Sequence, residues 1–303
     1  MNSKEAYLSY CQTHEVPLFM QPWWLDAVCV EGKEWRVLLS KENGNIVGAL
    51  PYLYRKKYGV KLGMPLQFTQ LINAEYANDL PSLIDDERLT FFFQHISYDE
   101  SMAELLKRNG FVVKNRFTYR ITDLSDMDAV YARFSLNKKR QIEKAKKLDL
   151  RLDTLSATEM YDFHKQCLKK RGSEIFYSRT LFCALCEAAV AHGQGRVLAA
   201  RSFQGDLLAA VFLVWDEQFC YYLVPTFDPD FAKTGASAWL TFEAIKFAQS
   251  HSQIFDFEGS MIGRIAKNYR QFGSEQYSYY KIEKCYNPLF GFLWKMYKRW
   301  QRK

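Results

Sequence analysis

Residues 219–282 carry the most regular pattern of hydrophobic and polar positions in the chain. The segment begins with aromatic and β-branched residues, which are typical of a half-buried strand. Apolar residues then recur at nearly helical spacing from Trp239 to Ala248, and a later apolar run is too short for a helix. The predicted elements are a strand at 219–227, a helix opened by residues 234–237, a strand at 254–257, a basic helix ending at Gly273 and a strand at 274–282.

Two other pairs of apolar runs predict β-hairpins. The first pair is joined by Asn43-Gly44, a preferred two-residue turn because both residues tolerate a positive φ. The second pair is joined by Gln204-Gly205-Asp206 and leads directly into the 219–282 segment. The remaining pattern predicts strands at 89–96 and 111–121, and helices at 101–109, 157–171 and 178–192.

One constant offset relates the two halves of the chain. It lays Asn43-Gly44 on Gln204-Gly205, and it lays Tyr119-Arg120-Ile121 on Tyr280-Lys281-Ile282. Because the order of elements also agrees, the sequence predicts two copies of one α/β unit. The predicted organisation is a supporting unit at 1–125, a unit with the active cleft at 126–285, and a basic amphipathic helix at 286–303.

Composition and charge narrow the class of protein. The 303 residues can form two domains, and the aromatic share of 16% fits broad sheets around a large cleft, although core packing explains it too. A net charge of +7 favours an anionic partner without demanding nucleic acid. A polar N-terminus, short apolar runs and seven irregularly spaced cysteines lead us to expect a cytoplasmic protein. No metal-ligand cluster or nucleophilic triad is visible in the sequence, so we expect no metal.

Three motifs of the second half resemble those of the GNAT superfamily of acyl-CoA N-acyltransferases. They are residues 234–237 at the start of a helix, 255–260 at a strand and turn, and 269–273 at the end of the next helix. The doubled arrangement and the basic segment 137–147 resemble the FemAB-like branch, and the likeness covers about residues 20–285. It implies a tandem duplication of a GNAT-like unit, each a mostly antiparallel mixed sheet flanked by helices, that transfers an acyl group to an amine.

The resemblance implies acyl-CoA as the donor, bound at the predicted helix start. Backbone N–H groups there could hold the donor phosphates, with help from the helix dipole. The usual GNAT loop reads Arg/Gln-x-x-Gly-x-Gly/Ala, whereas Ala232 stands at its first position and Lys233 is the nearest cation. The expected donor-binding residues are Tyr222, Val224, Lys233, Gly235, Ala236 and Ser237.

Aminoacyl-tRNA is the alternative donor that the resemblance implies. Several FemAB-like proteins that use it insert a long coiled-coil arm into the second unit. In this chain only a short loop around Gly172-Ser173-Glu174 joins the two helices at that place. Acyl-CoA is therefore favoured over aminoacyl-tRNA.

Asp256 and Glu258 are the candidate bases that would take a proton from the amine. Because they are two positions apart on the predicted strand, they should face the same side. The alternative is that one of them only pairs with a neighbouring cation. Arg270 stands where FemAB-like enzymes have a lysine; it could hold a phosphate or carboxylate of the acceptor, but it cannot act as a base.

Two other segments supply candidates for substrate binding. One is a loop-rich stretch expected to face a cleft, and the other is the basic run 137–147, which could steer an anion. The alternative for the basic run is a solvated helix face. The candidate residues are Thr69, Gln70 and Tyr76 in the loop, and Arg140 and Lys144 in the basic run.

The C-terminal segment 288–303 predicts a basic amphipathic helix without any acidic residue. Docking of its apolar face on the core is the simplest interpretation, and peripheral contact with the inner face of an anionic membrane is the alternative. The apolar face consists of Leu289, Phe292, Leu293, Met296 and Trp300.

These observations favour an N-acyltransferase that moves an acyl or aminoacyl group from a CoA or tRNA carrier to an amine. A cell-envelope or peptidoglycan precursor is one candidate acceptor. The alternative is a non-catalytic protein that uses the same scaffold to bind an anionic ligand or RNA. CoA-dependent loss of a free amine would favour the enzyme, whereas salt-dependent RNA retention without turnover would favour the binding protein.

Overall fold

The computed structural model describes residues 2–72 and 78–300. The chain divides into two compact units, one made of Met1–Arg116 with Ser278–Lys303 and the other of Phe117–Tyr277. These bounds differ from the expected boundaries at 125 and 285, because the last strand and the C-terminal helix group with the N-terminal unit. No helix in the described residues is both long enough and apolar enough to cross a membrane.

The first unit is built on a sheet with the strand order β1-β2-β3-β4-β11. β1 and β2 form the predicted hairpin, with φ angles of 50° at Asn43 and 84° at Gly44. β3 pairs antiparallel with β2 and parallel with β4, and β11 pairs antiparallel with β4. Its elements are α1 (Ser3–Cys11), α2 (Pro22–Ala27), β1 (Glu34–Glu42), β2 (Asn45–Lys57), β3 (Val60–Met64), α3 (Leu80–Asp86), β4 (Phe91–Ile96), α4 (Glu100–Arg108), β11 (Glu275–Cys285) and α11 (Pro288–Trp300).

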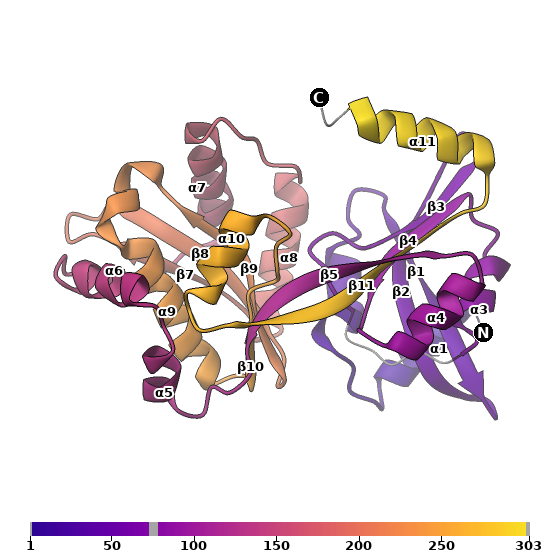
Figure 1. Cartoon of the computed structure of the whole chain (residues 1–303), viewed down its shortest axis with the longest axis horizontal. Coiled ribbons are helices and arrows are strands. Elements are labelled where there is room, and N and C mark those ends of the chain that lie inside the picture. The colour runs from indigo at the N-terminus through magenta and orange to yellow at the C-terminus, as the bar shows by residue number, and fades with distance from the viewer. Residues whose placement is uncertain (1, 73–77, 301–303) are drawn as a thin grey trace. The chain divides into compact units, whose positions relative to one another are not determined.

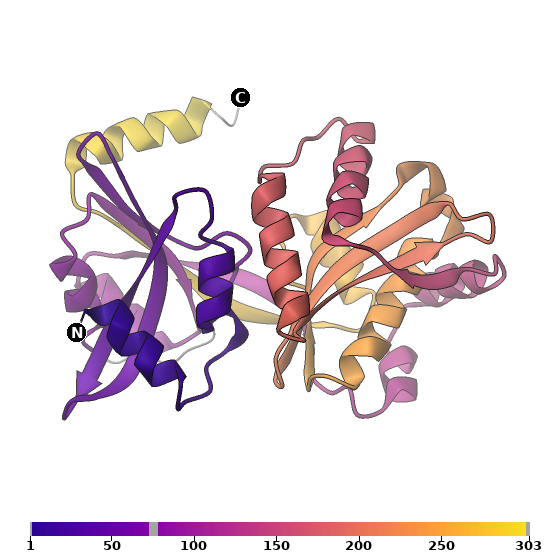
Figure 2. The same ribbon diagram turned by 180° about the vertical axis from the view of Figure 1, so that it is seen from behind.

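The second unit has the strand order β5-β10-β9-β8-β7-β6, with a parallel pairing between β9 and β10. α7 and α8 cover one face of its sheet, and α9 with α6 covers the other (Figures 1 and 2). Its elements are β5 (Val112–Ile121), α5 (Met127–Ala132), α6 (Leu136–Lys146), β6 (Arg151–Thr154), α7 (Ala157–Lys170), α8 (Arg179–Ala191), β7 (Gly195–Arg201), β8 (Leu207–Trp215), β9 (Phe219–Phe227), the 3-10 helix η2 (Pro229–Thr234), α9 (Ala236–Gln249), β10 (Ile254–Asp256) and α10 (Gly263–Arg270).

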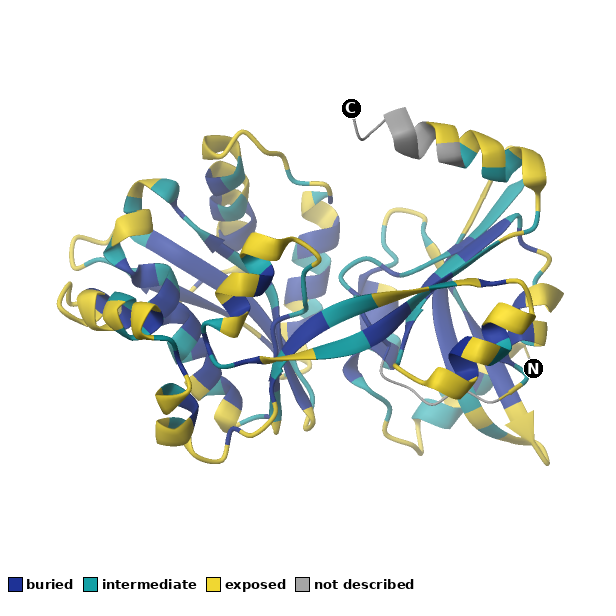
Figure 3. Cartoon of the chain, viewed as in Figure 1, coloured by how far each residue is buried: buried dark blue, intermediate teal, exposed yellow. Residues whose placement is uncertain are grey.

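The core of the second unit explains much of the aromatic content. β8 is buried along most of its length because helices cover both faces of the sheet, as Figure 3 shows in dark blue. Beside it, Phe257 stacks on Tyr269 with ring centroids 4.6 Å apart, and Phe272 lies 5.8 Å from Phe257. Phe257 directly follows β10, and the other two rings lie at and just after the end of α10.

The predicted repeat corresponds to an exchange of strands. Tyr280–Cys285 of β11 pairs with β4 and completes the sheet of the first unit. Arg120 and Ile121 of β5 pair with β10 in the second unit. The last strand of each repeat thus completes the sheet of the other repeat. The predicted fold class is confirmed: mixed, mostly antiparallel sheets flanked by helices.

Some local elements differ from the sequence predictions. β10 ends at Asp256, one residue early, and η2 occupies the segment between the predicted strand at 219–227 and the start of α9. The sequence pattern missed α1, α3 and α5, which are short, and β6, an edge strand whose residues are all exposed. Such elements lack the repeated apolar positions from which helices and strands are predicted.

The C-terminal helix docks on its own unit, but not through the predicted apolar face. The rings of Phe290 and Trp294 lie 6.0 and 5.8 Å from that of Phe91 at the start of β4. The predicted face, represented by Leu289 and Phe292, is exposed. The expectation that this face packs on the core was wrong.

Candidate functional site

The site lies where β9 and β10 stop pairing. Their parallel pairing joins Ile254–Asp256 to Phe219–Tyr221, after which β9 continues alone on this side to Phe227. Phe212 of β8 pairs with Val224 but Leu213 pairs with Tyr222, so Leu223 forms a bulge in β9. A bulge bends its strand and interrupts the ladder, which separates β9 from the chain that follows β10.

A cavity of about 510 Å³ opens beside this part of β9. Its volume falls within the range of about 300–1,000 Å³ that is usual for small-molecule sites. β9, α9, α6 and α10 supply most of the wall, together with Arg171 at the end of α7. The lining includes the apolar or aromatic residues Tyr222, Pro225, Phe227, Ala238, Ile265, Tyr269 and Phe272, and the polar residues Lys138, Gln141, Arg171, Ser237, Thr241, Arg264 and Asn268.

The start of α9 forms one wall of the cavity. Gly235 precedes the helix with a φ of 85°, and a Cβ atom there would lie only 2.1 Å from the carbonyl oxygen of Gln141 on α6. Glycine alone combines this left-handed conformation with so close an approach. Gly235 has no side chain with which to cap the helix, and the N–H of Ala236 donates to Thr234 Oγ1 at 3.2 Å. The first turn therefore directs N–H groups and the positive end of the helix dipole toward the cavity.

Three cations line the cavity, and no Asp or Glu is among the lining residues described. Lys138 is only 6% exposed, and its Nζ donates to Asn268 Oδ1 at 2.7 Å and to Gln141 Oε1 at 3.2 Å. Desolvation lowers the pKa of Lys138 to about 8. Arg171 and Arg264 are the other two cations, both exposed. A buried ammonium held by neutral amides is a setting in which an anion would supply the missing countercharge.

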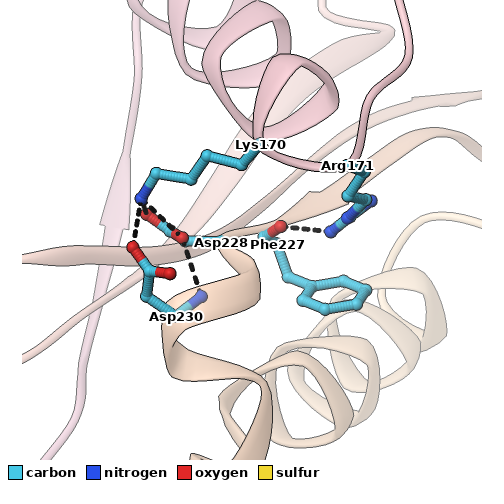
Figure 4. Close-up of polar contacts among 5 residues, drawn as sticks. All are labelled: Lys170, Arg171, Phe227, Asp228 and Asp230. Atoms are coloured by element: carbon cyan, nitrogen blue, oxygen red, sulfur yellow. Dashed lines mark hydrogen bonds and ion pairs between the residues drawn. The ribbon is translucent and has the colours of Figure 1, made fainter.

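The segment that leads into α9 is fixed to the end of α7 by two adjacent basic residues. Figure 4 shows Lys170 Nζ between Asp228 and Asp230, at 2.6 Å from an oxygen of each carboxylate. Burial alone would raise the pKa of Asp228, but the Lys170 ammonium lowers it below its ordinary value. Arg171 donates to the carbonyl oxygen of Phe227 and lies over its ring at 4.0 Å. η2 and the Arg171 guanidinium are thereby held in place beside the cavity.

Asp256, the first predicted base, is engaged in a buried network. Its carboxylate accepts hydrogen bonds from Thr118 Oγ1 at 2.5 Å, Arg120 Nε at 2.7 Å and the N–H of Glu258 at 2.8 Å. Asp256 is 3% exposed and forms an ion pair with Arg120. This is the pairing with a neighbouring cation that we considered as the alternative, and it suits a residue that positions its neighbours.

Glu258, the second predicted base, does not share a strand face with Asp256. It follows β10 in a turn with a φ of 60°, so the expected same-side geometry was wrong. Among the described residues its carboxylate has no hydrogen-bond or ion-pair partner. Burial and the charge of Asp256 raise the pKa of Glu258 well above its ordinary value. Burial, Tyr222 and then Glu258 raise the pKa of Tyr269, whose side chain lines the cavity. Glu258 itself is not among the described lining residues.

Several predicted site residues lie outside the cavity lining. Arg270 is exposed, with its guanidinium 5.6 Å from the ring centre of Tyr119. Lys233 is exposed, and its carbonyl oxygen accepts a hydrogen bond from Lys144 Nζ at 2.7 Å. Lys144 therefore fixes the end of η2. Val224 in β9 and Ala236 at the start of α9 are buried, and Arg140 is exposed. Asp256 and Glu258, described above, are outside the lining as well.

The predicted substrate-binding loop belongs to the first unit. Thr69 is buried and accepts a hydrogen bond from Trp24 Nε1 at 2.9 Å. Gln70 Nε2 donates to the hydroxyl of Tyr279 at 2.9 Å. Tyr76 lies outside the described residues. Thr69 therefore has a packing role here, and Gln70 stays a prediction for substrate contact.

The sequence analysis missed the three cations that line the cavity. Lys138 shares one face of α6 with Ile142 and Ala145, which are buried. That helical spacing marks Lys138 as the lysine of the basic run that faces inward, and it was available in the sequence. Arg171 and Arg264 carry no comparable signal, because exposed arginines at helix ends are common.

The comparisons with known proteins agree with this fold. Residues 132–271 match the family described as "Acetyltransferase (GNAT) domain". No curated protein sequence matches the chain. FemX matches with a TM-score of 0.73 at 12% identity, over 96% of this chain and 98% of FemX.

Two further solved structures match along most of the chain. L-PGS from Bacillus licheniformis has a TM-score of 0.59 at 11% identity, over 94% of this chain and 93% of that protein. A tandem GNAT protein from the clavulanic acid biosynthesis pathway has a TM-score of 0.52 at 11% identity, over 89% of this chain and 97% of that protein. Residues 132–271, which hold the three cations and Glu258, therefore form a GNAT-superfamily domain within a fold that nearly the whole chain shares with FemX and tandem GNAT proteins.

Proposed function

We propose that this chain is an acyltransferase that moves an acyl or aminoacyl group from a phosphate-bearing carrier to an amine. The observation that supports this most is the cavity at the start of α9, lined by Lys138, Arg171 and Arg264 without a carboxylate among its described lining residues. Keeping a lysine buried among neutral amides costs folding free energy, and a bound anion would supply the countercharge that offsets this cost. Phosphates of the donor supply that anion.

The favoured carrier is acyl-CoA. Aminoacyl-tRNA is the alternative, because it also carries phosphate groups. Its phosphates bind the N–H groups of the first turn of α9 and the three cations. Its acyl-bearing end lies along the aromatic side of the cavity, at Tyr222 and Tyr269. The GNAT domain supports an acyl donor of this kind.

Glu258 acts as the general base. The amine nitrogen attacks the acyl carbonyl carbon, its proton passes to the Glu258 carboxylate, and the bond from the acyl carbon to the CoA sulfur breaks. The thiolate that leaves then takes a proton from solvent. Asp256 holds the turn that carries Glu258 by accepting its backbone N–H, and it is itself held by Arg120.

The acceptor is an amine whose class the cavity does not specify. Arg270 and Arg140 are exposed on the second unit and stay predictions for contacts to an anionic acceptor. A cell-envelope precursor is one candidate, because such precursors carry both amines and phosphates. Peripheral attachment to a membrane would suit it.

The test is a transfer assay on the full chain. Thiol release from acetyl-CoA and longer acyl-CoAs is measured with a panel of amines, in parallel with transfer from aminoacyl-tRNA. We expect Glu258→Gln to lower kcat by about 10²- to 10⁴-fold without weakening donor binding. Glu174→Gln, in an exposed loop of the same unit, is the control and should be unchanged. No turnover with any donor, together with salt-dependent RNA retention, would instead identify a non-catalytic binding protein.

A further inference from the structure

Four large apolar side chains of α11 are exposed on one face of the helix. Leu289, Phe292, Leu293 and Met296 are between 53% and 69% exposed. Their spacing of three, four and seven residues puts them on one stripe. The helix is held to its own unit from another side, through the rings of residues 290 and 294. An exposed apolar group of this size marks an interaction site.

The turn between β2 and β3 lies at the same end of the sheet as α11. Leu62 of β3 pairs with Phe91 of β4, and Phe91 pairs with Cys285, just before the helix. The carbonyl oxygen of Thr90 also accepts a hydrogen bond from the N–H of Tyr286 at 3.0 Å. Figures 1 and 2 show this end of the sheet beside α11. At the turn, Tyr58 is 92% exposed.

Basic residues accompany both features in the sequence. The turn is preceded by three exposed basic residues, and the sequence from 288 to 303 has five basic residues and no acidic one. Asp85, an acid at this end of the sheet, is already paired with Lys284 at 2.7 Å. The basic residues are Arg55, Lys56 and Lys57 before the turn, and Lys295, Lys298, Arg299, Arg302 and Lys303 in the C-terminal segment.

We propose that this end of the first unit binds the surface of an anionic phospholipid bilayer. The apolar stripe of α11 and Tyr58 enter the boundary between headgroups and acyl chains, and the exposed Arg55, Lys56 and Lys57 contact lipid phosphates. A second copy of the chain would bring its own positive charge against this surface. A nucleic acid would contact the basic residues but would not bury the apolar stripe. A lipid surface matches both features. The inference stands independently of the acyltransfer proposed above.

The test is co-sedimentation of the full chain with vesicles. Phosphatidylcholine vesicles are compared with vesicles of phosphatidylcholine and phosphatidylglycerol, at low and high salt. We expect binding to the anionic vesicles that weakens as salt rises, because screening reduces the attraction between the basic residues and the lipids. Absence of binding to anionic vesicles at low salt would overturn the proposal.

Two matched pairs of variants separate the apolar and charged contributions. Phe292→Ser/Leu293→Ser should lower partitioning at least about tenfold, whereas the exposed pair Phe176→Ser/Leu148→Ser should leave it unchanged. The second pair of variants reverses charge. Lys56→Glu/Lys57→Glu should weaken binding to anionic vesicles, whereas its control on α7, Lys165→Glu/Lys169→Glu, should not.

The substituted side chains are exposed, so each variant should keep the thermal midpoint of the wild type. An α11 variant that binds anionic vesicles like the wild type would contradict the proposal. So would a self-association, measured by analytical ultracentrifugation, that depends on Phe292 while vesicle binding does not. Retention of RNA that depends on Lys56 but not on Phe292, without vesicle binding, would assign the surface to nucleic acid.

Discussion

At the scale of single residues, Lys138 links stability to binding. Burial lowers its pKa from an ordinary value of 10.5 to about 8. Below pH 8 the folded state therefore holds a buried, charged ammonium, which lowers its stability. Lys138→Met should therefore raise the free energy of unfolding at pH 7 by about 1–3 kcal/mol, measured with denaturant. Lys139 Nζ donates to the carbonyl oxygen of Ala132 at 2.8 Å and lies 5.5 Å from the ring centre of Tyr131, so Lys139→Met should change the free energy of unfolding by less than about 0.5 kcal/mol. Marked destabilisation by Lys138→Met would contradict this account.

The same residue should give stability a defined pH dependence. Between about pH 8 and 10.5 the unfolded chain still binds a proton on Lys138 and the folded chain has released it. The unfolded state then holds more protons, so the contribution of this group to stability rises with pH across that window. The difference between wild type and Lys138→Met in denaturant unfolding should shrink from pH 7 to pH 10. A constant difference would show that the lysine keeps its proton.

Glu258 and Lys138 together predict a bell-shaped pH profile for transfer. The rate should rise as Glu258 loses its proton, at a pH above the ordinary range of a glutamic acid, because its pKa is raised. It should fall above about pH 8, where Lys138 loses the charge that holds the donor. The measurement is kcat/KM against pH. A profile whose acid limb is unchanged in the residual activity of Glu258→Gln would exclude Glu258 as the base.

At the scale of elements, the approach of α9 to α6 depends on Gly235. Gly235→Ala places a Cβ atom against the Gln141 carbonyl and in a left-handed conformation, which should cost about 2–4 kcal/mol and weaken donor binding at least tenfold. Gly193→Ala is the control, because its φ of 67° is similar but no atom lies within 4 Å. It should show only the smaller conformational cost, of about 1 kcal/mol. Equal effects of the two variants in thermal unfolding would exclude the close approach as the cause.

The start of α9 was predictable from sequence, but the geometry of the base was not. A glycine between a polar turn and an apolar periodic segment identifies the helix start. By contrast, β10 ends at Asp256 because that carboxylate captures the Glu258 N–H, and this capture turns the chain. The two-residue spacing of Asp256 and Glu258 had suggested that both side chains share one face of the strand. Side-chain hydrogen bonds to the backbone compete with strand geometry in a way that periodicity does not reveal.

At the scale of the whole molecule, the repeat predicted two related units but not the exchange of their last strands. Pairing of β11 with β4 joins residues about two hundred positions apart, for which a single sequence carries no signal. The exchange predicts that residues 117–277 fold alone with their cavity. Residues 1–116 alone should aggregate, because β4 then has an unpaired edge. Circular dichroism and thermal unfolding of both fragments would check this, and a soluble, cooperatively folded 1–116 would contradict it.

The central claim is that the cavity of the second unit binds a phosphate-bearing acyl carrier, and isothermal titration calorimetry tests it most directly. Wild type, Lys138→Met and Lys139→Met are titrated with acyl-CoAs and, separately, with aminoacyl-tRNA. We predict that one carrier binds the wild type and Lys139→Met, about 10- to 100-fold more tightly than Lys138→Met. Binding should also weaken from pH 7 to pH 9 as Lys138 loses its charge. If neither carrier binds, or if Lys138→Met binds as tightly as the wild type, the claim is contradicted.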